Sequence, residues 1–325
     1  AGARAADKAS ARAVPRARRL RRRPARPRAT TTTTSSASSS SSAGTGEHEH
    51  EHEHEPLPCV LEPKRVVLVR HGQSTWNKEG RIQGSSDHAV LTAKGELQAE
   101  MNRAMLEGER FELCYRSPLK RSARTAEVIW ADRQGRVEDL WDLREIDLYS
   151  FQGLLKEEGK ARFGERYRMW QRAPGEFEID GHFPVRELWE RARACWDEIL
   201  SSEERSILVV AHNAVNQALV ATAVGVRPEY FRRLLQSNCG VSVLDFGPRT
   251  FPAALAEPCV SVNRLNQTPY SALEGGGAGR AARARVLLVA HGETPACREG
   301  RFLGRSDAAR MSRLGEAQGR RLGEL

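Results

Sequence analysis

Between about Lys64 and Asn266, short apolar runs alternate with longer segments whose apolar residues recur at helical spacing. Val66–Val69 and Ile207–Ala211 show no polar alternation, as expected of parallel strands that are covered on both faces. Strands that alternate with helices favour an α/β fold, in which helices pack on both sides of one sheet. We therefore expect a three-layer α/β sandwich with a mostly parallel sheet.

Two predicted helices follow the first strand. One covers Leu91–Leu106, with Thr92 as its N-cap. Its apolar residues are expected on one face: Leu97, Met101 and Met105. The second begins at Ser117 and Pro118, as N-cap and first helical residue.

Two more helices flank the second apolar run. Arg186–Leu200 precedes it, and Val215–Val224 follows His212 directly. The apolar residues of the earlier helix recur three or four positions apart, which predicts a face buried in the core. They are Leu188, Trp189, Ala192, Trp196 and Ile199.

The first 46 residues are rich in Arg, Ala, Ser and Thr and contain a single acid, Asp7. Such a segment cannot bury a core, and its composition predicts an organelle transit peptide rather than a plain basic tail. Glu47–Glu55 alternates Glu and His. Histidines two apart could bind a metal, but the flanking carboxylates and the lack of apolar residues favour a solvated linker over 47–63.

The net charge is +9, which by itself suggests a nucleic-acid partner. The excess of basic residues lies in 1–46 and 280–325, however, and the middle of the chain is close to neutral. A nucleic-acid footprint is expected on the folded domain, so we expect none, and no apolar run is long enough for a membrane span. The six cysteines show no Cys-x-x-Cys or zinc spacing, which predicts free thiols in a reducing compartment.

The beginning of the domain recurs, without gaps, near the end of the chain. Val286–Glu293 repeats the strand and loop around His71, and places His291 at the same position. The repeat has Ala290 and Cys297 where the first copy has arginine and asparagine. We therefore expect a linker over 271–285 and a truncated, degenerate second copy of the domain over 286–325.

The candidate chemistry lies at the ends of the two apolar runs. Arg70-His71-Gly72 follows the first and His212 follows the second. In open α/β sheets, ligands bind beyond the carboxyl ends of the strands. A neutral imidazole can attack phosphorus and form a covalent intermediate, a guanidinium can hold phosphoryl oxygens in bidentate fashion, and glycine lets the backbone approach closely. The two histidines predict a phosphoryl-transfer site.

Three cations gather near the start of the helix that follows Ser117: Lys120, Arg121 and Arg124. The helix macrodipole makes cations unfavourable there, and a bound anion would reverse the balance. We therefore favour an anion site over the alternative of a solvated basic surface.

These motifs resemble the histidine phosphatase, or phosphoglycerate mutase-like, superfamily. Arg70-His71-Gly72 matches its signature, Arg121 its second phosphate arginine and His212 its second histidine. Glu145 falls where the family places its proton donor. The resemblance covers roughly residues 64 to 246, so we expect a phosphatase domain over 64–270. One departure is Asn213, where family members often have glycine.

The resemblance implies that His71 becomes phosphohistidine while Glu145 protonates the leaving group and then activates water. Asp147 is the alternative acid. The phosphoryl oxygens would be held by Arg70, Asn77, Arg121 and His212. Further substrate contacts are expected from Gln83, Gly84 and Asn213. No metal and no other cofactor is required, because arginines supply the positive charge.

The short interval between Glu145 and His212 resembles the phosphatase branch rather than the mutases, which carry an insertion there. Phosphoglycerate mutase activity and a non-catalytic phosphate-binding module remain alternatives. Three further stretches, Arg144–Gly153, Gln236–Phe246 and Asn263–Pro269, resemble a plastid branch of the family in plants and green algae. That likeness implies hydrolysis of a small sugar phosphate that inhibits Rubisco, in the chloroplast stroma; the mitochondrial matrix and the cytoplasm are alternatives.

Overall fold

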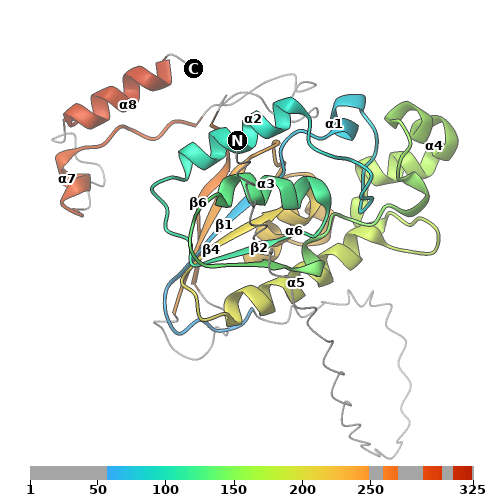
Figure 1. Cartoon of the computed structure of the whole chain (residues 1–325), viewed down its shortest axis with the longest axis horizontal. Helices are drawn as coiled ribbons and strands as arrows, with labels where there is room; N and C mark the ends of the chain where they lie inside the picture. Colours follow the sequence, from blue (N-terminus) through green and yellow to red (C-terminus); the bar gives the residue numbers. More distant parts are fainter. Residues whose placement is uncertain (1–56, 249–258, 270–287, 302–309, 324–325) are drawn as a thin grey trace, which may run out of the picture. The chain divides into compact units, whose positions relative to one another are not determined.

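The computed structural model describes residues 57–248, 259–269, 288–301 and 310–323. The predicted transit peptide, the Glu/His repeat and the predicted linker over 271–285 lie outside these residues. A six-stranded sheet forms the centre of the fold, with its strands in the order β3-β2-β4-β1-β5-β6 (Figure 1). The strands are β1 (Lys64–Arg70), β2 (Leu113–Arg116), β3 (Arg136–Asp139), β4 (Ser206–Ala211), β5 (Val241–Gly247) and β6 (Cys259–Gln267).

The sheet is mostly parallel, as predicted. β1 pairs in parallel with β4, with Val66 opposite Ile207, and β2 pairs in parallel with both β4 and β3. β5 is antiparallel to its neighbours β1 and β6, so it alone runs against the other strands of this sheet. The two predicted apolar runs are thus central, adjacent strands.

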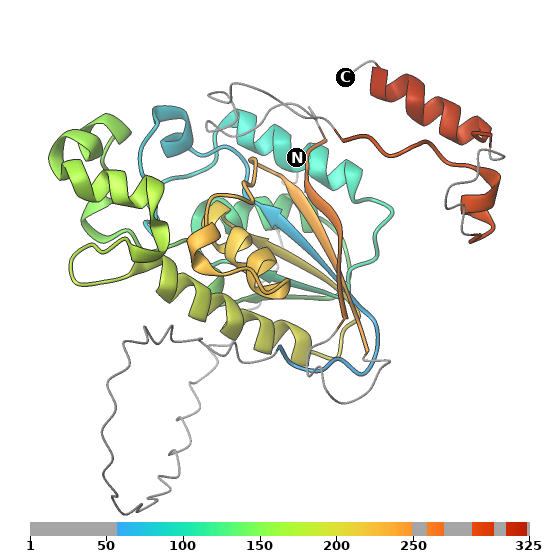
Figure 2. The same cartoon turned by 180° about the vertical axis from the view of Figure 1, so that it is seen from behind.

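Helices cover both faces of the sheet, which confirms the three-layer α/β sandwich. Alternate β1 residues face opposite layers: Val67 and Val69 pack in a cluster with α2 and α3, and Val66 and Leu68 in one with α5 and α6. Figures 1 and 2, seen from opposite sides, show these two layers. The helices are α1 (Thr75–Glu79), α2 (Ala93–Met105), α3 (Lys120–Trp130), α4 (Lys156–Arg172), α5 (Pro184–Ser201), α6 (Asn213–Ala223), α7 (Pro295–Arg298) and α8 (Arg313–Gly323).

Helix α2 has the predicted cap but not the predicted buried face. The Thr92 side chain accepts a hydrogen bond from Gly95 N at 3.1 Å. Leu97 is 61% exposed, however, and the buried residues include Gln98 and Asn102. Polar side chains face inward because they bind the backbone of loops: Gln73 N donates to Gln98 Oε1 at 2.9 Å, and the Asn102 amide donates to Cys239 O at 3.0 Å.

Helix α3 begins two residues later than predicted, at Lys120, with Leu119 as an N-cap that makes no side-chain hydrogen bond. Ser117 is therefore not the N-cap of this helix. Helices α5 and α6 agree with their predictions to within a few residues. The predicted core residues of α5 are all buried: Leu188, Trp189, Ala192, Trp196 and Ile199.

The folded region begins before Lys64. Leu57 and Val60, in the segment predicted as a linker, are 6% and 5% exposed and belong to the main hydrophobic cluster. None of the described helices combines the length and the apolar character that a membrane span needs. Free thiols are recorded at Cys114, Cys195, Cys239 and Cys297.

The described part of the second copy repeats the local structure of the first. Glu293 N donates to Gln318 Oε1 at 2.8 Å, as Gln73 N does to Gln98 Oε1. Thr294 caps α7 by accepting from a backbone N–H, as Ser74 caps α1 in the first copy. The repeat is therefore structural as well as sequential.

A close contact between two glycines fixes the loop after β1 against α2. A Cβ on Gly72 would lie 2.4 Å from Gly95 O, and a Cβ on Gly95 would lie 2.2 Å from Gln73 O. Both distances are far below van der Waals contact, so only glycine fits. The loop that follows His71 depends on this pair.

We expect Gly95→Ala to destabilise the domain by about 1–3 kcal/mol, because a methyl group would collide with rigid backbone. Alanine ordinarily stabilises a helix relative to glycine. A decrease in the free energy of unfolding would therefore itself indicate the close contact. Gly108→Ala is the matched control, since a Cβ there meets nothing within 4 Å. Chemical denaturation measures both variants, and equal stability of the two would contradict the close approach.

Candidate active site

The two strand-end histidines lie side by side. Because β1 and β4 are parallel neighbours, with Arg70 opposite Ala211 in register, their carboxyl ends reach the same edge of the sheet. His71 N donates to Ala211 O at 3.0 Å. The imidazole ring centroids of His71 and His212 are 5.1 Å apart, with 63° between the planes. The structure thus brings together the pair on which the sequence argument depends.

The His71 ring is buried and oriented by its own backbone. Its Nδ1 lies 2.7 Å from Gly72 O, and a carbonyl oxygen can only accept, so Nδ1 carries the proton. In the neutral ring the lone pair is therefore on Nε2. Burial lowers the pKa of His71 well below 6.5, and the charges of Arg121 and Arg70 lower it further. The ring is held as a neutral nucleophile.

His212 is fully buried on the other side of the pair. Its Nε2 lies 2.8 Å from Ser117 Oγ, and within the described residues its buried Nδ1 has no hydrogen-bond partner. Burial lowers the pKa of His212 well below 6.5, followed by the charges of Arg121 and His71. A buried polar atom without a partner is unusual and fits a group that contacts a ligand.

Ser117 is a site residue that the sequence interpretation missed. It was expected to cap a helix, but it follows the end of β2 (Leu113–Arg116) and contacts His212 instead. Strand β2 is parallel to β4, so its carboxyl end reaches the same edge of the sheet. The strand-end argument that selected the histidines also applies to this serine.

Arg121 alone among the three cations near the start of α3 is buried. Its two terminal nitrogens donate to Ser86 O at 2.7 Å and Gly84 O at 3.0 Å. Its Nε is buried and has no partner among the residues described. Burial lowers the pKa of Arg121 to about 10, opposed by the charges of Glu145 and Asp87. The side chain remains a cation and points its charge into the site.

The other two cations do not support an anion site. Lys120 is exposed and lies 3.7 Å from a carboxylate oxygen of Asp87, and Arg124 is exposed and lies 3.0 Å from one of Glu96. Lys120 and Arg124 therefore belong to a solvated basic surface, which was the alternative interpretation. The macrodipole argument therefore holds for Arg121 only.

Arg70 and Asn77 lie at the partly exposed side of the site. One Arg70 guanidinium nitrogen donates to Gln236 O at 2.6 Å. The Asn238 amide donates both to His71 O and to Asn77 Oδ1, each at 3.1 Å. Gln236 and Asn238, from the loop before β5, are thus further supports for the site that the sequence interpretation did not identify.

Glu145 is buried at the N-terminus of α6, directly beside His212. Its Oε1 accepts hydrogen bonds from Ala214 N at 3.0 Å and Val215 N at 3.2 Å. These backbone N–H groups at the start of α6 hold the Glu145 side chain in place beside His212. Asp147, the alternative acid, is more exposed and lies near Arg191 and Tyr149.

The three predicted substrate contacts lie around this centre, but their oxygens already have partners. Gln83 Oε1 accepts from Ser74 Oγ at 2.9 Å, and Gly84 O accepts from Arg121. Asn213 Oδ1 accepts from Gln236 N at 3.2 Å. The amide nitrogens of Gln83 and Asn213 remain as donors for an oxyanion. In the part of the chain that the structure describes, no group of three His, Cys, Asp or Glu side chains suits a metal ion.

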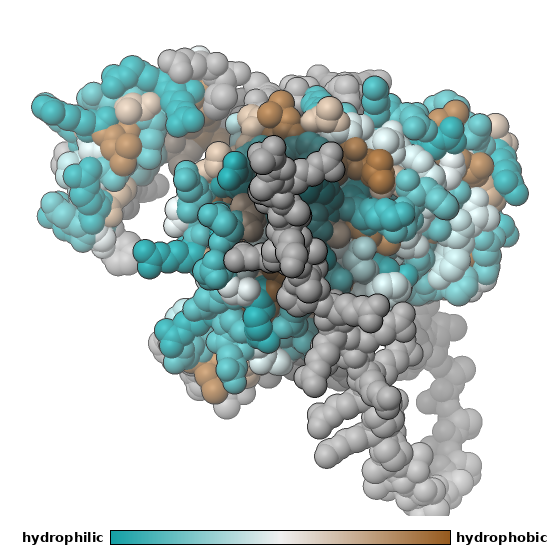
Figure 3. All heavy atoms as spheres, viewed as in Figure 1, coloured by the Kyte–Doolittle hydropathy of each residue, from teal (hydrophilic) through white to brown (hydrophobic). Residues whose placement is uncertain are grey.

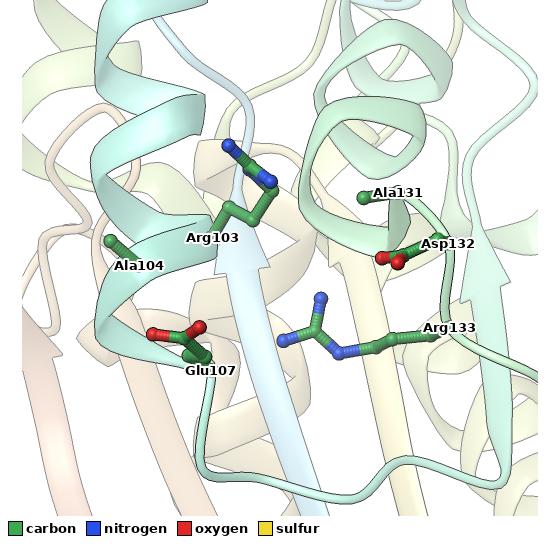
Figure 4. A pocket seen from close by; sticks show the side chains of 6 residues that line it. All are labelled: Arg103, Ala104, Glu107, Ala131, Asp132 and Arg133. Atoms are coloured by element: carbon green, nitrogen blue, oxygen red, sulfur yellow. The ribbon is translucent and has the colours of Figure 1, made fainter.

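A separate hollow of about 250 Å³ lies between the ends of α2 and α3 (Figure 4). Helices α2 and α3 run back across the sheet, so this hollow lies at the edge opposite the histidines. Arg133 reaches into it and donates to Leu106 O at 2.7 Å and to Ile129 O. It satisfies carbonyls at the ends of both helices, which is a structural role. The face seen in Figure 3 is mainly hydrophilic, with separate hydrophobic patches.

Several known proteins are similar to this chain. It is 64% identical over 231 residues to a protein of Arabidopsis thaliana named "Probable 2-carboxy-D-arabinitol-1-phosphatase", covering 71% of this chain and 47% of that protein. It is 57% identical over 271 residues to 2-carboxy-D-arabinitol-1-phosphatase of Triticum aestivum, covering 83% and 54%. The chain thus spans about half the length of the curated relatives it matches.

Solved structures and a family model give the same assignment of fold. A mycobacterial glucosyl-3-phosphoglycerate phosphatase superposes with a TM-score of 0.57 at 22% identity, covering 64% of this chain and 100% of that one. The model of the histidine phosphatase superfamily (branch 1) matches residues 66–256. That match spans both strand-end histidines, the buried arginine and the carboxylate beside α6. The chain belongs to the histidine phosphatase superfamily.

Proposed function

We propose that this protein hydrolyses a phosphomonoester through a phosphohistidine at His71. The observation that carries the proposal is the paired imidazoles, 5.1 Å apart, buried next to Arg70 and Arg121. Two cations and two neutral rings suit a phosphoryl group, whose negative charge would satisfy the nitrogens that lack partners. The positive charge that a metal ion would otherwise supply comes from the guanidinium groups, so turnover needs no added metal.

In the proposed first step, His71 Nε2 attacks phosphorus in line with the ester oxygen. The N–P bond forms as the P–O bond breaks, and the leaving alkoxide takes a proton from Glu145. In the second step the carboxylate of Glu145 takes a proton from water, whose oxygen attacks phosphorus and releases His71. The phosphoryl oxygens are held by Arg70, Asn77, Arg121 and His212.

We propose a small sugar phosphate as substrate, specifically 2-carboxy-D-arabinitol 1-phosphate, because the two relatives that cover most of this chain bear the name of that activity. Such an activity removes an inhibitor of Rubisco, which implies the chloroplast stroma. We accordingly propose residues 1–46 as a transit peptide, a phosphatase domain that runs from Leu57 rather than Lys64 to about residue 270, and 286–325 as a partial second copy. Neither a nucleic acid nor a membrane is proposed as a partner.

Replacement of the nucleophile is expected to abolish the phosphoenzyme. His71→Asn lacks the attacking lone pair, so hydrolysis of p-nitrophenyl phosphate should fall by on the order of 10³-fold or more. Acid quenching with labelled substrate should trap phosphohistidine in the wild type only. His88→Asn, at an exposed histidine, is the control. A trapped phosphoenzyme in His71→Asn would refute the assignment, and conversion of 3- to 2-phosphoglycerate would favour a mutase.

Removal of the proton donor is expected to slow poor leaving groups most. Glu145→Gln keeps the shape but cannot protonate an alkoxide, so the rate on a sugar phosphate should drop by about 10²–10⁴. Hydrolysis of p-nitrophenyl phosphate, whose leaving group needs no proton, should drop less in its first step. Asp147→Asn is the matched comparison. If that variant shows the larger dependence on leaving group, Asp147 is the acid instead.

The cationic surroundings of the histidines predict a loss of stability in acid. The pKa of His71 in the folded protein lies well below 6.5, the value in the unfolded chain. As pH falls below about 6.5, the unfolded state binds protons first, so the free energy of unfolding decreases. Each such histidine contributes at most ~1.4 kcal/mol per pH unit to this decrease in the free energy of unfolding. Denaturation at several pH values between 7 and 5 gives the free energy of unfolding as a function of pH. This free energy should change less steeply with pH for His71→Asn than for the wild type and His88→Asn.

A further inference from the structure

Arg232 is a second largely buried arginine near the phosphate site, and the proposed mechanism does not use it. It lies between η4 (Pro228–Tyr230) and β5. Its guanidinium carbon is 4.4 Å from the ring centroid of Trp170 and 5.4 Å from that of Phe231. Both distances are within the usual range for cation–π contacts. Two aromatic rings thus lie against the guanidinium.

No carboxylate balances this charge among the residues that the structure describes. Arg232 makes no ion pair there, and its buried Nε has no hydrogen-bond partner. Burial lowers the pKa of Arg232 to about 10, opposed only by Tyr167. The indole Nε1 of Trp170 is likewise buried without a partner. Two unpartnered donors beside an uncompensated cation are suited to an anion.

The backbone at Arg232 is strained. Its φ is +74°, a left-handed conformation that residues other than glycine rarely adopt. The conformation is held by a hydrogen bond from Arg232 N to Gln217 Oε1 at 3.0 Å. Strain of this kind persists where the surroundings impose it, and it clusters at ligand sites. Here it sets the direction of the guanidinium.

A short chain of hydrogen bonds joins Arg232 to the phosphate site. The Gln217 amide donates to Asn213 Oδ1 at 3.1 Å, and the same oxygen accepts from Gln236 N at 3.2 Å. Gln236 O in turn accepts from Arg70 at 2.6 Å. Arg232 therefore lies on the loop that carries a support of Arg70, and Gln217 links its backbone to Asn213, the residue that follows His212.

The aromatic partner of Arg232 packs against a residue that follows Glu145 in the chain. The rings of Trp170 and Phe151 meet edge to face at a centroid distance of 5.6 Å. Phe151 is buried in the loop that follows Glu145. Arg232 and Trp170 thus connect the loop of the proposed acid to the loop before β5, on the flank of the phosphate site.

We propose that Arg232, with the Trp170 indole N–H, binds a carboxylate of the substrate and selects phosphomonoesters that carry one. The inference deepens the proposed function and rests on it. A carboxylate is planar and singly charged, so it matches the planar geometry and the single charge of a guanidinium. A substrate without that group would leave the cation desolvated and unpaired.

The test compares two substrates that differ only in the carboxylate: 2-carboxy-D-arabinitol 1-phosphate and D-arabinitol 1-phosphate. The measured quantity is the ratio of their kcat/KM values with the full chain. We expect Arg232→Gln to lower this ratio by about 10- to 100-fold, the range for a lost charged hydrogen bond. Arg233→Gln, at the exposed neighbouring arginine, should leave the ratio unchanged.

A second variant covers the case in which Arg232→Gln does not fold. Trp170→Phe keeps the aromatic stack but removes the indole N–H, and it should lower the ratio several-fold. An unchanged ratio in the folded variants, or an equal loss on both substrates, would overturn the inference. A larger effect on a sugar bisphosphate than on the carboxylated ester would overturn the choice of carboxylate. If the wild type hydrolyses neither ester nor p-nitrophenyl phosphate, the proposed function fails instead.

Discussion

The burial of positive charge at one edge of the sheet is the constraint on which the site depends. Burial lowers the pKa of both His71 and His212, and the charge of the fully buried Arg121 lowers both further. Protonation of either ring would add a third cation to a site with few carboxylates, so the rings remain neutral and nucleophilic. The same constraint gives the site its affinity for an anion, because the negative charge of a phosphoryl group compensates the positive charge that folding buries. Burial beside the arginines therefore contributes both to the reactivity of the rings and to the recognition of an anion.

The parts of the molecule that could be predicted from the sequence are those that follow from local periodicity. Val66–Val69 and Ile207–Ala211 are apolar because both faces of their strands are covered. Once these runs are parallel neighbours, geometry brings His71 and His212 to the same edge without further information. The α5 core residues follow in the same way. The charge pattern grouped Arg121 with two other cations and only the family resemblance singled it out; the structure separates it by burial from Lys120 and Arg124, which pair with surface acids.

The parts that could not be predicted depend on hydrogen bonds between distant segments. Gln98 and Asn102 are buried in α2 because loops from elsewhere in the chain need their amides, so a hydrophobic pattern selects the wrong face. Ser117 has the signature of a helix cap, yet its hydroxyl contacts His212. Arg232 looks like an ordinary loop arginine in the sequence. Its importance comes from the Trp170 ring on α4, from the adjacent Phe231 ring and from a positive φ. The contact with α4 and the backbone conformation cannot be read from the local sequence pattern.

The second copy separates the residues that build the strand-end loop from those that perform chemistry on it. Gly292 and Gly315 keep the same close backbone approach as Gly72 and Gly95, and the cap and the glutamine contact persist. The guanidinium before the histidine is lost, since Ala290 stands there. His291 is also exposed, whereas His71 is buried. The loop geometry is thus encoded by glycines and capping residues, and it persists in the second copy without a guanidinium at the position of Arg70.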